Sequence, residues 1–125
     1  MKDVVQRAGM DILELSRFQH AIQRSGISFL HRILSERERN ETAEDLYPIL
    51  FSAKESLIKL TGGLPPATSF LQIEVLIQAN SSLEIKLYPP YSELARQMQI
   101  DFEHIKGTYQ IYSEELICTS LTYCN

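Results

Sequence analysis

The segment from Leu46 to Gly63 constrains the fold of this chain more than any other part of the sequence. Asp45 is expected to cap the N-terminus of a helix here, and Pro48 falls in its first turn, where a missing N–H has little effect. Gly62-Gly63 is expected to end the helix. Apolar residues recur at intervals of three and four, which predicts one face packed against a core: Leu46, Ile49, Leu50, Ala53, Leu57 and Leu60.

The side of this helix opposite the apolar stripe is expected to be polar, with Ser52, Glu55 and Lys59. Glu55 and Lys59 are four residues apart and project from the same face. Phe51 and Ile58 flank Glu55, which indicates that apolar surface borders the carboxylate, as in a cleft or a subunit interface. The pattern leaves two interpretations open: a solvated Glu55–Lys59 pair worth about 0.3–0.5 kcal/mol, or a functional site.

The other segments predict an α+β fold in a single domain over residues 1–125, with an antiparallel sheet packed against the long helix. Gly9 permits a bend or a close backbone approach in the first strand, and Asp11 lies at or near the end of that strand. Residues 36–45 are mostly charged or polar, so we expect a solvated turn or an exposed helix end there. The expected strands cover residues 4–15, 70–78, 83–87, 105–112 and 116–123, and shorter helices cover 15–24, 29–34 and 91–99.

Composition limits the classes of function. A formal net charge of -4 argues against a general polyanion-binding protein, because nucleic-acid-binding domains usually carry a basic excess. No apolar run approaches the roughly 18 residues needed to span a bilayer, and the N-terminus turns polar too soon for a signal peptide. On one strand, Cys118 and Cys124 would lie about 20 Å apart, beyond disulfide reach. We therefore expect a cytoplasmic protein with two reduced, buried thiols.

A basic stripe lies on the first expected helix. Arg17, His20 and Arg24 are spaced so that they share one face of it. Such a stripe on an acidic protein suits an acidic partner surface rather than bulk polyanion, although a solvated face without a partner is the more common case. Both interpretations stay open on the spacing alone.

Three motifs occur in an order that is specific to one family. Residues 9–18 read Gly-Met-Asp-Ile-Leu-Glu-Leu-Ser-Arg-Phe, and residues 32–38 read Arg-Ile-Leu-Ser-Glu-Arg-Glu. A Phe-x-x-Lys-Glu-x-x-x-Lys-x-x-Gly signature is matched by Phe51, Lys54, Glu55, Lys59 and Gly62. The chain thereby resembles the holo-acyl-carrier-protein synthase group of 4′-phosphopantetheinyl transferases, and the resemblance implies the 4′-phosphopantetheinyl transferase fold.

This resemblance implies transfer of phosphopantetheine from coenzyme A to a serine of an acyl carrier protein, with release of 3′,5′-ADP. It implies that Asp11 and Glu55 bind Mg²⁺ together with the pyrophosphate of coenzyme A, which fits the oxygen ligands that this cation prefers. It further implies that Glu55 helps to deprotonate the serine, directly or through water. Lys59 and Lys54 would then lie against the phosphates.

The resemblance also implies partners. Gly62 and Gly63 would allow close approach to the nucleotide, and Arg17 and Arg24 would dock the acidic helix of the carrier protein. The family is commonly a homotrimer with active sites at its subunit interfaces. In its second half the chain departs from the family pattern, because residues 80–82 read Asn-Ser-Ser where a Gly-Lys-Pro turn is usual. Two functions therefore remain open: an active transferase, or a non-catalytic member that acts as a carrier-binding or assembly module.

Overall fold

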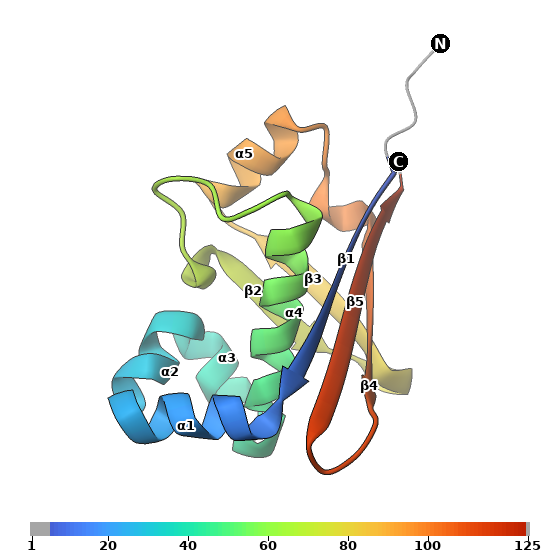
Figure 1. Ribbon diagram of the computed structural model, residues 1–125. Helices are drawn as coiled ribbons and strands as arrows, with labels where there is room; N and C mark the ends of the chain where they lie inside the picture. The colour runs from blue at the N-terminus through green and yellow to red at the C-terminus, as the bar shows by residue number, and fades with distance from the viewer. Residues whose placement is uncertain (1–5, 125) are drawn as a thin grey trace.

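The fold is a five-stranded antiparallel sheet with a long helix across one face (Figure 1). The computed structural model describes residues 6–124, so residues 4 and 5 of the first expected strand lie outside the described part. The strand order is β1-β5-β4-β3-β2, which makes β1 and β2 the two edges. The predicted α+β architecture is confirmed, with strands β1 (Gln6–Glu14), β2 (Ile73–Ile77), β3 (Ser82–Leu87), β4 (Ile105–Ile111) and β5 (Leu116–Cys124).

The helices divide between the two ends of the long helix α4, as Figure 1 shows. α1, α2 and α3 gather near the end where α4 begins, and α5 lies near the end where it finishes. Only Gly26, with φ of 61°, separates α1 from α2, so α2 begins two residues earlier than expected. The bounds are α1 (Leu15–Ser25), α2 (Ile27–Ile33), α3 (Glu36–Glu41), α4 (Tyr47–Leu60) and α5 (Tyr91–Gln97).

α4 forms where its apolar spacing predicted a helix, but its N-terminus is built differently from the expectation. The N-cap is Leu46, and no side chain caps the helix there. Asp45 belongs to a short 3₁₀ turn, Glu44–Leu46, that leads directly into α4. The predicted cap by Asp45 is therefore wrong, while Pro48 does lie in the first turn.

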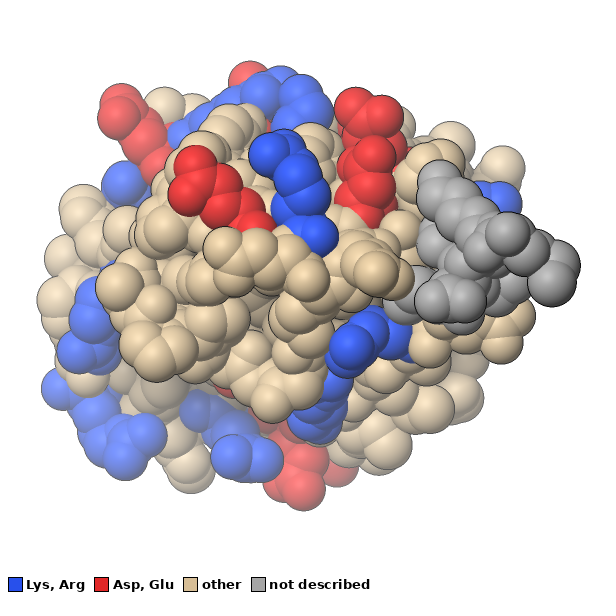
Figure 2. Space-filling model, turned by 90° about the horizontal axis from the view of Figure 1, so that it is seen from above, with Lys and Arg blue, Asp and Glu red and all other residues tan. Residues whose placement is uncertain are grey.

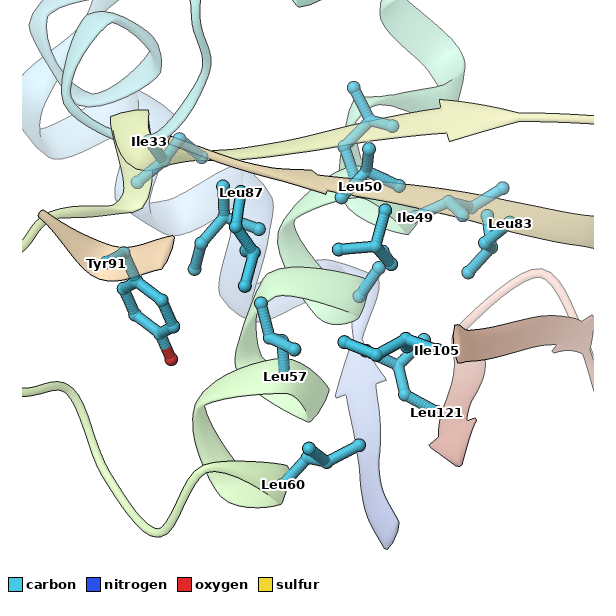
Figure 3. Close-up of a cluster of buried hydrophobic side chains, with 14 of the residues drawn as sticks. Ile33, Ile49, Leu50, Leu57, Leu60, Leu83, Leu87, Tyr91, Ile105 and Leu121 are labelled. Carbon is cyan, nitrogen blue, oxygen red and sulfur yellow. The ribbon is translucent and has the colours of Figure 1, made fainter. Parts of the chain in front are cut away.

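The core lies between α4 and the sheet (Figure 3). Ile49, Leu50, Leu57 and Leu60 of α4 are at most 2% exposed and point toward strand residues such as Leu121. Burying aliphatic side chains of this size stabilises a fold by about 1.5–3 kcal/mol each. The predicted apolar stripe thus positions α4 on the sheet.

Residues 36–45 are not simply solvated. They contain α3, whose N-terminus carries a capping box: the Ser35 hydroxyl accepts from the Glu38 amide at 3.1 Å, and the Glu38 carboxylate accepts from the Ser35 amide at 2.8 Å. Glu38 is only 1% exposed, because its other oxygen accepts from the Val75 amide of β2 at 2.9 Å. The expectation of a fully solvent-exposed segment is therefore wrong at Glu38.

Smaller differences occur at element ends. The expected strand 70–78 begins with a 3₁₀ turn, Phe70–Gln72, whose cap Ser69 accepts from the Leu71 amide, and β2 follows at Ile73. Cys118 is only half-buried and Cys124 is exposed. Strand alternation places both on the outer face of the sheet, the face away from α4, so the expectation of two buried thiols is wrong.

The surface carries both signs of charge. Figure 2, which looks down on the end that bears α5, shows acidic and basic side chains in small separate groups with uncharged surface between them. Within residues 6–124, no helix is both long enough and apolar enough to cross a membrane.

Candidate active site

A pocket of about 720 Å³ lies between α1, β1 and the middle of α4. β1 and α1, which follow each other directly in sequence, bring charged side chains to it, and so does the more distant α4. Its charged and titratable lining residues are Asp11 of β1, Arg17, His20 and Arg24 of α1, and Glu55 and Lys59 of α4. The structure therefore brings together both predicted metal ligands, the predicted basic stripe and one of the two predicted phosphate-binding lysines.

Asp11 is held from both sides. Residues alternate along β1, so Gly9, Asp11 and Leu13 face α4. One carboxylate oxygen of Asp11 accepts from Lys59 Nζ at 3.2 Å, and the other accepts from Ser52 Oγ at 2.8 Å. The Asp11 side chain is 14% exposed, whereas that of Lys59 is 56% exposed. An anchored carboxylate thus faces the pocket with an exposed cation beside it.

Glu55 is half-buried at the wall of the same pocket. Burial raises the pKa of Glu55 above the usual carboxyl value, and the negative charge of Asp11 raises it further, against smaller opposing effects of Lys59 and Arg17. Lys59 pairs with Asp11, and its ammonium also donates to the Met10 carbonyl at 3.1 Å. The site interpretation of the Glu55 pattern is therefore favoured over a solvated Glu55–Lys59 pair.

The apolar border predicted beside Glu55 is an aromatic cluster. The ring centroid of Phe51 lies 5.7 Å from that of Phe18, 5.8 Å from that of Phe29 and 5.9 Å from that of Phe70. Phe18, Phe29 and Phe51 also line the pocket. Aromatic pairs at these separations add to area burial, so the cluster fixes α1 and α2 against α4 and lowers the local polarity around the carboxylate.

Gly9 sets the distance between β1 and α4. A Cβ atom at this position would overlap the Ser56 carbonyl oxygen and would lie 2.7 Å from the Leu60 amide nitrogen. Both are backbone atoms of α4, which cannot move aside as a flexible side chain would. The close approach predicted for Gly9 is therefore confirmed, and it is what brings Asp11 to α4 two residues later.

Comparison with known proteins identifies this arrangement. The family profile described as the 4′-phosphopantetheinyl transferase superfamily matches residues 7–117. This chain belongs to that superfamily. A holo-[acyl-carrier-protein] synthase of Serratia proteamaculans is 31% identical over 103 residues, which cover 78% of this chain and 82% of the relative. The predicted resemblance to the holo-acyl-carrier-protein synthase type is confirmed.

Solved structures of the superfamily share the fold. The acyl carrier protein synthase of Plasmodium yoelii, solved with ADP bound, has a TM-score of 0.76 at 22% identity and covers 99% of this chain and 98% of its own. The holo-[acyl-carrier-protein] synthase of Helicobacter pylori, solved with coenzyme A, has a TM-score of 0.66 at 19% identity, with 94% of this chain and 99% of its own covered. The fold therefore extends through the second half, where the sequence departs from the family pattern.

The structure changes one predicted role, that of Lys54, the first lysine of the phosphopantetheinyl transferase signature. Its side chain is 0% exposed, and its ammonium donates to Glu38 at 2.7 Å, to the Ile33 carbonyl at 2.6 Å and to the Phe70 carbonyl at 3.0 Å. All three N–H bonds are used. This geometry contradicts the predicted phosphate contact of Lys54 and makes it a link between α4, α2 and α3.

Ser52 is also placed differently from the expectation. It was expected on the polar, outward side of α4, yet it is 0% exposed. β1 and β5 cover that side of α4. Ser52 contacts Asp11 of β1 and Thr119 of β5, and these two residues pair directly across the strands. Sequence reasoning missed Thr119 as part of the site. The available signal was the alternation of β5, which places Thr119 on the inward face of the sheet. No residue near Thr119 in sequence indicated that its hydroxyl would contact those of Ser52 and Ser56.

Gly62 and Gly63 lie at the C-terminal end of α4 and do not line the pocket. Both are exposed and have positive φ, 82° and 134° respectively, which only glycine adopts readily. The preceding Thr61 hydroxyl contacts the buried Tyr91 hydroxyl of α5 at 2.7 Å. α5 thus anchors the base of this glycine turn, while the turn itself remains open to solvent.

Proposed function

We propose that this protein transfers 4′-phosphopantetheine from coenzyme A to a serine of an acyl carrier protein and releases 3′,5′-ADP in a Mg²⁺-dependent reaction. One observation carries the proposal: Asp11 and Glu55 share a pocket with Lys59 and with the arginines of α1. Membership of the superfamily and the names of the relatives support the same reaction class.

The two carboxylates fit a hard divalent cation. Mg²⁺ prefers oxygen ligands and usually binds one or two carboxylates together with substrate phosphates. The charge of Asp11 raises the pKa of Glu55, so the pair repels itself in the absence of a cation and would bind one favourably. When bound, Mg²⁺ supplies neutralisation of the charge on the pyrophosphate. Asp11 and Glu55 are the residues that would hold it.

The remaining steps are assigned to the chain's own groups. The serine oxygen of the carrier forms a bond to the phosphorus that bears pantetheine, and the bond from that phosphorus to the 3′,5′-ADP oxygen breaks. Glu55, whose pKa is raised by burial, accepts the serine proton directly or through water. Lys59 presents an exposed ammonium to the phosphates, and Gly62 and Gly63 let the nucleotide approach the backbone.

The carrier protein is proposed to dock on α1. Arg17 and Arg24 are on the side of α1 that lines the pocket, and Arg24 lies in the last turn of the helix. Two guanidinium groups beside the pocket suit an acidic helix that presents a serine. Replacing Arg17 or Arg24 with glutamate should raise the KM for the carrier protein, with an effect that shrinks as salt increases.

A homotrimer with active sites at its interfaces is part of the proposal. β1 is an edge strand, and Met10 and Ile12 on its outer face are 56% and 61% exposed. Exposed apolar side chains on an unpaired edge favour association with another copy. Equilibrium sedimentation of the wild type and of Met10→Glu would test this, and a wild-type monomer would contradict it. We further propose a cytoplasmic location.

Mass spectrometry tests the central proposal. The protein is mixed with coenzyme A, Mg²⁺ and a panel of apo carrier proteins, and one carrier is expected to gain the mass of one phosphopantetheine. Glu55→Gln should abolish the gain. Carrier binding without any mass gain would instead support the non-catalytic binding or assembly module.

A further inference from the structure

Three hydroxyl groups connect the core of the molecule to Asp11. Ser52 Oγ lies 2.8 Å from an Asp11 oxygen, Thr119 Oγ1 lies 2.9 Å from Ser52 Oγ, and Ser56 Oγ lies 2.6 Å from Thr119 Oγ1. Ser52, Ser56 and Thr119 are each 0% exposed. The three hydroxyls are therefore shielded from bulk solvent, and they hydrogen-bond to one another and to the carboxylate.

The carboxylate determines which way the protons point. An ionised Asp11 can only accept, so the single O–H of Ser52 must donate to it. Thr119 must then be the donor to Ser52, and Ser56 the donor to Thr119. Ser56 has a second acceptor, the Thr119 carbonyl at 3.2 Å, so its O–H is shared between two acceptors. The three O–H groups thus donate one to the next, and the series ends at Oδ2 of Asp11.

We propose that Ser52, supported by Thr119 and Ser56, is a positioning residue that holds the Asp11 carboxylate ready to bind a divalent cation. The last torsion of an aspartate is broad, so an unrestrained carboxylate samples many orientations. Here Oδ2 is tied to Ser52 in the core, and Oδ1 is left beside the exposed Lys59 at the pocket. Fixing a ligand before binding increases affinity, because less ordering remains to be done.

This inference rests on the proposed function in one respect, since it takes Asp11 as a cation ligand. A purely stabilising hydroxyl chain makes a different prediction from a positioning one. If the chain only stabilised the fold, loss of a hydroxyl would lower the melting temperature and leave the cation affinity of the folded protein unchanged. If it positions Asp11, cation affinity falls in order of proximity to the carboxylate: Ser52 first, then Thr119, then Ser56.

The experiment measures binding of Mn²⁺ alone by calorimetry, without coenzyme A or carrier protein, because Mn²⁺ accepts the same oxygen ligands as Mg²⁺. Thermal unfolding of each variant is recorded beside it. Ser52→Ala should weaken Mn²⁺ binding about tenfold, as expected for one hydrogen bond to a charged group. Thr119→Val, which keeps the shape of the side chain, should have a smaller effect, and Thr119→Ser should restore wild-type affinity.

Ser92→Ala is the matched control, because Ser92 is 8% exposed on α5 and does not line the pocket. A folded Ser52→Ala with wild-type Mn²⁺ affinity would overturn the inference. If Ser52→Ala does not fold, Thr119→Val decides, and unchanged affinity there would overturn it equally. A wild type that binds no Mn²⁺ also overturns it. A wild type that binds Mn²⁺ but modifies no carrier contradicts only the proposed function, while a variant series that binds in the predicted order still supports positioning.

Discussion

Lys54 and Lys59 lie five residues apart on α4, and each pairs with a carboxylate, yet their surroundings differ completely. Lys54 is sealed in the core with Glu38, both side chains being 0% exposed. Lys59 and its partner Asp11 are 56% and 14% exposed at the pocket. A buried pair that loses one partner leaves an uncompensated charge, whereas an exposed pair contributes little to stability. One pair therefore contributes to the stability of the fold, whereas the other lies at the pocket.

The largest expected effect is on the buried pair. Lys54→Met should lower the free energy of unfolding by about 3–5 kcal/mol, because Glu38 would be left buried without its cation. Urea denaturation measures this loss. In the double variant Glu38→Gln with Lys54→Met no charge is left behind, so it should be more stable than Lys54→Met alone. A Lys54→Met protein as stable as the wild type would show that the buried pair does not stabilise the fold.

For the exposed pair, Lys59 and Asp11, we expect a large effect on activity and a small effect on stability. Lys59→Met is expected to lower kcat/KM for phosphopantetheine transfer about 100-fold, as for loss of a charged group that stabilises phosphate oxygens. Its free energy of unfolding should change by less than about 1 kcal/mol. Lys59→Arg, which keeps the charge, should retain more activity than Lys59→Met. Strong destabilisation by Lys59→Met would show that both lysines maintain the fold.

Glu55 adjoins Lys54 in sequence, but it lines the pocket together with Lys59. In the metal-free protein, ¹³C-detected titration should give Glu55 a pKa above the ordinary carboxyl value. Asp11→Asn should lower that pKa, because it removes the second cause of the shift, but burial should keep it above the ordinary value. Glu103→Gln is the control, because Glu103 is exposed and does not line the pocket, and it should leave the pKa of Glu55 unaffected. A pKa unchanged by Asp11→Asn would contradict the close pairing of the two carboxylates.

The smallest expected effect concerns stability at Glu55. Its folded-state pKa is raised, so the folded protein binds the proton more tightly and the charged form disfavours folding. Glu55→Gln should therefore stabilise the protein by less than about 0.5 kcal/mol at neutral pH. The gain should vanish as the pH falls below the carboxyl pKa of the unfolded chain. Denaturation at pH 8 and pH 4 measures it, and a loss of stability at pH 8 would contradict it.

Part of this arrangement could be predicted from the sequence. The apolar spacing from Ile49 to Leu60 predicted the core face of α4, because helical periodicity is a local property. The convergence of Asp11, Glu55 and Lys59 rested on the family resemblance. The partner of Lys54 could not be predicted, since Glu38 lies on a separate short helix and its segment is otherwise rich in polar residues.

The hydroxyl chain could not be predicted either, because its contacts join residues that are far apart in sequence. Ser52 and Ser56 are on the side of α4 that would be solvated in an isolated helix, and only the packing of β1 and β5 against that side buries them. Thr119 meets them through a contact 63 to 67 residues away in sequence. Such pairings depend on strand register, which follows from the whole sheet rather than from any short motif.

Gly9 allows β1 to lie directly against α4, because it has no side chain. Because backbone atoms of Ser56 and Leu60 occupy the space that a Cβ atom would need, a single methyl group there would act as a wedge between β1 and α4. The two carboxylates would then separate even though neither had been altered, since one travels with the strand and the other with the helix. The size of residue 9 therefore sets the separation of the two carboxylates, and there is no room for even one additional carbon atom.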